Sequence, residues 1–237
     1  MQTIPLTGNI RRHITLFFLL LFLLLMAIYT YWRMYPPLGP EEIVQKALAN
    51  LEKAQSYTYN LNAVSLIQGQ ESLLTQVEGA WKAPDSHYIK GETLGNTLEA
   101  YIIADNYMIK DPQGDWLEFR GGEGPSLLRE TVLFSQTPLR DLHGFHSGQI
   151  AAEKTVAGRK CYVLTGRLTR VSNPLWQAFW QDFTCQLWID KKELFLRQLW
   201  LAGVSIGSED RLTVFLELAD YDAQLTIIPP LPKDKQQ

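Results

Sequence analysis

Residues 57–63 read Tyr-Thr-Tyr-Asn-Leu-Asn-Ala, and this alternation of larger apolar and polar side chains indicates the fold class of the chain. Side chains of a strand point alternately to its two faces, so a period of two predicts a strand with one buried face. The alternation reaches Ile67 and, after a turn at residues 69–71, resumes through Leu73, Val77 and Trp81. These two segments predict an antiparallel hairpin.

Further strand patterns follow along the chain, separated by turns rich in Gly, Pro, Asn and Asp. They cover residues 87–93, 97–104, 106–110, 149–156, 160–169, 184–190, 194–202, 211–219 and 224–228. Pro229, Pro230 and Pro232 end the pattern, because proline cannot donate to a strand ladder. The sequence therefore predicts an α+β fold that is mainly β, with about ten or eleven antiparallel strands and no regular alternation of strand and helix.

One amphipathic helix is predicted to lead this domain. Ile43, Val44, Ala47, Leu48, Leu51 and Ala54 recur at helical spacing. Pro40 suits the first turn, and the acidic pair Glu41 and Glu42 suits the positive end of the helix dipole. The middle of the chain is less regular, with a short helix predicted over 125–135 and a loop over 138–148.

The segment from His13 to Trp32, HITLFFLLLFLLLMAIYTYW, carries no charge after His13. About 19 helical residues span a hydrocarbon core of about 30 Å, so residues 13–35 are predicted to form a transmembrane signal anchor. Arg11 and Arg12 favour a cytoplasmic N-terminus for residues 1–12. We expect a spacer at 36–40, an extracytoplasmic domain at 41–230 and a tail at 231–237, on the outer face of a cytoplasmic membrane. Cleavage of the anchor, as in a signal peptide, stays open.

Composition excludes several classes of protein. The 237 residues carry 22 basic and 25 acidic side chains, evenly scattered, for a net charge of -3, which excludes a nucleic-acid partner. Hydrophobic residues make up 46% and aromatic residues 11%, as expected for a globular domain.

Cys161 and Cys185 are compatible with a disulfide in an exported domain. If their strands are antiparallel neighbours, however, Cys161 pairs near Lys191 and Cys185 near Leu168. The thiols then lie more than about 20 Å apart, too far for a bridge. Another topology would allow one, so the sequence leaves the bridge open.

Two motifs invite a catalytic or metal-binding interpretation. Gly203-Val-Ser205-Ile-Gly207 matches the nucleophile motif of serine hydrolases, but it lies between predicted strands and no histidine follows it, so catalysis by Ser205 is the last-ranked hypothesis. His143 and His146, with Asp141, lack the second ligand pair of a strong metal site. We predict no enzyme activity, no metal and no cofactor.

Aromatic residues supply the candidate binding site. A short helix over 174–183, capped by Asn173, would place its aromatic side chains on one face. Such a stripe can plug the core, form the lip of an apolar cavity, or touch a membrane interface. Several strands are apolar on both faces, which in an antiparallel sheet indicates cover by a helix, a second sheet or an apolar ligand. The candidate groove or lip residues are Trp81, Trp176, Phe179, Trp180, Phe183 and Trp200.

Four features of the chain, taken together, point to a known family. They are the leading helix, the meander, the segment Leu187-Trp-Ile-Asp-Lys-Lys-Glu-Leu-Phe-Leu-Arg197 and the ending Ala219-Asp-Tyr-Asp-Ala-Gln-Leu-Thr-Ile-Ile-Pro-Pro230. With these features the chain resembles the LolA/LolB-like superfamily. The resemblance implies a half-open antiparallel barrel wrapped round short helices, whose concave face holds acyl chains, as in the periplasmic lipoprotein carriers and the LppX–LprG type of lipid-binding lipoprotein. It implies a bacterial cell-envelope protein that binds a lipid or lipoprotein acyl chain. An alternative is an RseB-like sensor that binds an envelope protein in trans. The protein anchor departs from the family pattern.

Overall fold

The computed structural model describes residues 8–34, 38–120, 139, 141–169, 171 and 174–230. The chain forms two compact units, residues 1–39 and 40–237. In the first unit, helix α1 (Gly8–Met34) exposes large apolar side chains along residues 16–29. Within the described residues, no helix has the length and apolar character of a membrane span, so the predicted transmembrane segment at 13–35 is not supported.

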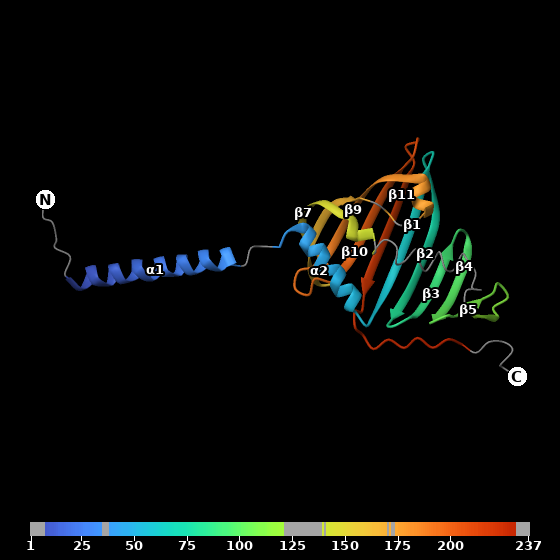
Figure 1. Cartoon of the computed structure of the whole chain (residues 1–237), viewed down its shortest axis with the longest axis horizontal. Helices are drawn as coiled ribbons and strands as arrows, with labels where there is room; N and C mark the ends of the chain where they lie inside the picture. The colour runs from blue at the N-terminus through green and yellow to red at the C-terminus, as the bar shows by residue number, and fades with distance from the viewer. Residues whose placement is uncertain are drawn as a thin grey trace. The chain divides into compact units, whose positions relative to one another are not determined.

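The second unit is an open antiparallel sheet of eleven strands with short helices, as predicted (Figure 1). Its first part contains α2 (Pro40–Lys53), β1 (Ser56–Ile67), β2 (Gln70–Lys82), β3 (Ser86–Thr93), β4 (Asn96–Ile103), β5 (Asn106–Lys110) and β6 (Trp116–Arg120). The second part contains η2 (Leu142–Gly144), β7 (Phe145–Val156), β8 (Arg159–Leu168), α4 (Pro174–Phe179), β9 (Trp180–Asp190), β10 (Leu196–Ser205) and β11 (Arg211–Ala219).

The spatial order of the strands is β6-β5-β4-β3-β2-β1-β11-β10-β9-β8-β7. Two meanders therefore meet where the first strand pairs with the last, with residues 58–66 of β1 antiparallel to 211–219 of β11. This long-range pair joins the two halves into one curved half-barrel.

Several predicted boundaries need correction. Residues 224–228 form no strand, and β6, which was missed, supplies the eleventh strand. The predicted loop at 138–148 contains the start of β7, and the predicted helix over 174–183 ends at Phe179, where β9 begins. The helix predicted at 125–135 and the cap at Asn173 lie outside the described residues.

The core lies on one face of the sheet, which we call the inner face. Directly paired residues of antiparallel strands point to the same face, and the inner row Leu61, Leu216, Leu199 and Leu187 is fully buried across four strands. Helix α2 adds Ile43, Val44, Ala47 and Leu48 to the core and contacts β7, β9 and β10 (Figure 1). The opposite, outer face carries mainly half-buried and exposed side chains.

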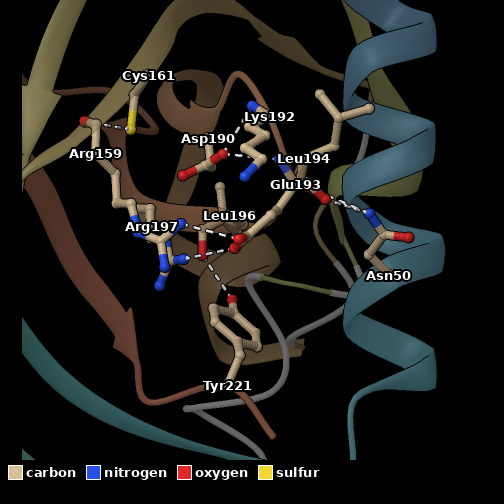
Figure 2. Close-up of polar contacts among 10 residues, drawn as sticks. All are labelled: Asn50, Arg159, Cys161, Asp190, Lys192, Glu193, Leu194, Leu196, Arg197 and Tyr221. Atoms are coloured by element: carbon tan, nitrogen blue, oxygen red, sulfur yellow. Dashed lines mark hydrogen bonds and ion pairs between the residues drawn. The ribbon is translucent and has the colours of Figure 1, made fainter.

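The segment 187–197 forms the end of β9, a turn and the start of β10 (Figure 2). Asp190 accepts hydrogen bonds of 2.8 Å from the backbone N–H groups of Lys192 and Glu193, which closes the turn. Asn50 of α2 donates to the carbonyl oxygens of Glu193 and Leu194 and so fastens the helix to this turn. We call these hydrogen bonds of Asp190 and Asn50 the clamp, because they close the turn and attach α2 to it. The segment on which the family resemblance rests thus has a structural role.

Removing the Asp190 carboxylate should loosen this clamp. Asp190→Ala leaves two backbone N–H groups without their acceptor, and we expect a loss of about 2 kcal/mol in the free energy of unfolding. Asp190→Asn keeps an acceptor and should lose less. Urea denaturation measures both, with Asp105→Ala in the exposed β4–β5 turn as the control. A loss no larger than that of the control would refute the clamp.

His87 of β3 is a buried histidine on the inner face, with 9% of its surface exposed. Burial disfavours the imidazolium and lowers the pKa of His87 to about 4, although Asp85 opposes the shift. Because the folded state holds His87 neutral, its contribution to stability is present above about pH 6.5 and is lost as the pH falls towards 4.

We therefore compare the free energies of unfolding of His87→Leu and the wild type at each pH. As the pH is lowered from 7 to 4, this difference should shift in favour of His87→Leu by up to about 3 kcal/mol. Urea denaturation at half-unit pH steps measures the difference. Gln113→Leu changes an exposed residue that does not titrate and should leave the pH profile unchanged. Equal profiles for His87→Leu and the wild type would show that His87 is not held neutral.

Candidate ligand pocket at one end of the half-barrel

A pocket of about 550 Å³ opens where α4, the start of β9 and the end of β8 meet. Its apolar lining is Leu168, Val171, Trp180 and Phe183. Its polar lining is His146, Arg167, Thr169, Gln177, Gln181 and Asp182. This volume lies in the usual range for ligand sites, and the mixed lining suits an amphipathic ligand.

The alternation of β9, next to a bulge, places Phe183 in this pocket. The β9–β10 register shifts between the pairs Thr184–Ala202 and Gln181–Val204, and Asp182 takes a positive φ of 52°. Phe183 lies on the Thr184 side of this bulge, and its regular alternation with Cys185 and Leu187 points it to the inner face over Gly203, where an added Cβ would lie 2.6 Å from the Phe183 ring. Gly203 thus gives the ring its space, and the phenyl group forms part of the pocket floor.

The polar side of the pocket is built from the ends of β7 and β8. Thr169 donates to the Gly144 carbonyl at 3.0 Å, and its hydroxyl lies 3.3 Å from Nδ1 of His146. Gln177 of α4 donates to the carbonyl of Val171. Arg167 and Asp182 add one charge of each sign, so a zwitterionic or neutral polar group fits the mouth better than a strongly charged one.

Exposed apolar side chains cluster at this same end of the sheet. Because neighbouring strands run in opposite directions, the β1–β2, β3–β4 and β10–β11 turns lie at the same end of the strands (Figure 1). We define the apolar rim as Ile67, Leu94, Phe179 and Ile206, which are 48%, 60%, 61% and 55% exposed. The N–H of Ile206 donates to the carbonyl of Phe179 at 3.0 Å, which joins a turn of the rim to α4.

The structure brings together part of the predicted aromatic site. Trp180 and Phe183 line the pocket, and Phe179 stands on the rim beside it. Trp176 lies in α4, but its side chain is outside the described residues.

Trp81 and Trp200 lie elsewhere. Trp81 shares the inner face but stacks on Tyr57 at the opposite end, about 26 Å along the strands, or eight residues, from the level of Phe183. Trp200 points to the outer face, where it pairs with Gln186 and Phe215. The polar lining residues Arg167 and Thr169 were missed, because their positions near a strand end carry no distinctive sequence pattern.

The motif around Ser205 lacks the geometry of a hydrolase. Ser205 is the last residue of β10, pairs with Trp180, and leads through a turn at Gly207 to another strand. The strand–turn–helix arrangement of a nucleophile elbow is therefore not formed here. His143 contacts Glu52 at 3.5 Å, whereas His146 faces Thr169, so the two histidines have different neighbours.

Both cysteines are free and buried. The predicted antiparallel pairing of their strands is confirmed, although Cys161 pairs with Asp190 and Cys185 with Gly166, each close to the expected residue. Burial raises the pKa of the Cys185 thiol to about 12, which makes it a poor nucleophile.

Comparison with solved structures finds two mycobacterial proteins of similar fold. The Mycobacterium tuberculosis lipoprotein LppX is similar at a TM-score of 0.56 and 12% identity, over 79% of this chain and 97% of LppX. LprF from Mycobacterium bovis is similar at a TM-score of 0.57 and 13% identity, over 81% of this chain and 96% of LprF. No family model and no curated protein matches the sequence. The predicted resemblance is confirmed at the level of the fold, which is like that of LppX and LprF.

Proposed function

We propose that the domain from Pro40 onwards is a non-enzymatic binding protein that shields a lipid or lipoprotein acyl chain. The observation that carries the proposal is the pocket beside Phe183, which has an apolar floor and a polar mouth next to the apolar rim. The LppX-like fold and the continuous apolar inner face also support it.

Burial of the chain provides the affinity without a catalytic group. Each methylene taken out of water contributes about 0.8 kcal/mol, so ten buried methylenes contribute about 8 kcal/mol before the cost of ordering the ligand. In this proposal the polar groups at the mouth hold the ligand's head, and the rim covers the chain while it enters.

The test is a titration of residues 38–237 with a fluorescent fatty acid, followed by competition with an unlabelled fatty acid. Saturable binding that the competitor reverses supports the proposal. Trp180→Ala should weaken binding while leaving the far-ultraviolet circular dichroism unchanged. A probe that shows no saturable binding to the folded domain would exclude an open acyl site.

Attachment to a membrane through α1 is a separate part of the proposal. The large apolar side chains exposed along residues 16–29 form a patch of the kind that marks a partner or membrane contact. The full chain should remain in the membrane fraction after an alkaline carbonate wash, and a chain without residues 8–34 should not. Release of the full chain by that wash would exclude firm attachment. An RseB-like sensor role stays the alternative prediction.

A further inference from the structure

The outer face carries one continuous row of side chains across nine neighbouring strands. Directly paired residues share a face, so the register aligns four polar residues of β4, β3, β2 and β1 with an aromatic residue of β11. They are Thr97, Glu92, Gln76, Asn62 and Phe215. The row continues through β10, β9, β8 and β7 with Trp200, Gln186, Thr165 and Gln149.

Two hollows lie along this row. The first, of about 590 Å³, is lined by the five row residues from Thr97 to Phe215. The second, of about 540 Å³, is lined by the four from Trp200 to Gln149. Phe215 and Trp200 pair directly, so two half-buried aromatic rings stand at the centre with a polar hollow on either side.

The polar groups of the row are available to a ligand. Among the described residues, the amides of Asn62, Gln76, Gln149 and Gln186 take part in no side-chain hydrogen bond with the protein. An amide offers two donor hydrogens and an acceptor oxygen, so each matches a ligand that carries both kinds of group. At about 4.8 Å between strands, nine strands give a path of about 38 Å, long enough for several sugar rings.

The charges of the first hollow select against anionic ligands, whereas the second hollow is lined by one charged residue, Arg167. The first hollow is bordered by Glu78, Glu92 and Glu217 and by one cation, Lys90. This excess of carboxylates repels phosphate-rich polymers and anionic lipids. A pyranose ring has an apolar face that stacks on an aromatic ring, and its hydroxyl and acetamido groups match the amides.

We propose that the outer face binds an uncharged polysaccharide strand rich in N-acetylhexosamine. The strand lies across the β-strands, stacks sugar rings on Trp200 and Phe215, and fills the two polar hollows. The second hollow shares Arg167 with the mouth of the acyl pocket, but all residues of the first hollow and the four row residues of the second lie outside that pocket, so the proposed sugar site does not rest on the proposed lipid function.

The experiment uses the full chain in a zwitterionic detergent without a sugar head group, titrated calorimetrically with a β-1,4-linked N-acetylglucosamine hexamer. We expect saturable binding that Trp200→Leu weakens about tenfold, whereas Trp200→Phe keeps a stacking face and changes it less than threefold. The double variant of the exposed Gln76→Ala with the half-buried Gln186→Ala should also weaken it severalfold. Asp105→Ala, in the exposed β4–β5 turn and outside both hollows, is the control and should have no effect.

Absence of hexamer binding at millimolar concentration would overturn the proposal. So would binding that neither Trp200→Leu nor the amide double variant changes. Binding of an oligolysine peptide in place of the hexamer would assign the acidic hollow to a cationic partner and would also overturn it. The amide variant tests the proposal even if Trp200→Leu fails to fold, because Gln76 is exposed.

Discussion

Gln181→Trp is expected to weaken binding of a fluorescent fatty acid by at least tenfold, which corresponds to about 1.4 kcal/mol. Gln181 is exposed and lines the pocket beside Phe183, so an indole at this position occupies ligand space without entering the core. The backbone pairing of Gln181 with Val204 is unaffected by the change of side chain. Titration of residues 38–237 measures the loss.

The matched control is Lys154→Trp, which adds the same side chain at an exposed position of β7 away from the pocket. It should bind the probe as the wild type does. If both variants bind equally well, the acyl chain does not use this pocket and the proposed entry site is wrong.

Leu216→Ala is expected to have the largest effect on stability. Leu216 is fully buried on the inner face, between Leu61 of β1 and Leu199 of β10, where the two meanders join. Truncation of such a leucine costs about 2–5 kcal/mol through lost burial and the cavity that remains.

Chemical denaturation of residues 38–237 gives the free energy of unfolding for this comparison. Thr213→Ala changes a half-buried residue on the outer face of the same strand and should cost less than about 1 kcal/mol. Similar losses for the two variants would contradict the assignment of the inner face.

The class of fold and most strands could be predicted because their signal is local. The alternation in residues 57–63 and the turn residues between strands decide each element without reference to distant parts of the chain. The pairing of β1 with β11 could not be predicted in the same way, because it joins residues about 150 positions apart through long-range packing.

The error at 180–183 has a similar cause. The aromatic pattern of residues 174–183 suits a helix, but pairing of β9 with β10 takes residues from Trp180 onwards into the sheet, where the alternation of β9 points Phe183 inward. Tertiary pairing overrides local preference here. Trp200 and Phe183 were predicted to share one site, but they point to opposite faces of the sheet. The face to which a strand residue points depends on register and bulges rather than on residue type.

The most direct test of the acyl-binding proposal is mass spectrometry of an organic extract from the purified domain, residues 38–237, directed to the extracytoplasmic side of a bacterial envelope. We predict about one lipid or lipoprotein-derived acyl chain per protein, reduced in parallel preparations of Gln181→Trp and unchanged in Lys154→Trp. A folded domain that carries no lipid and also fails to bind the fluorescent fatty acid would contradict the account.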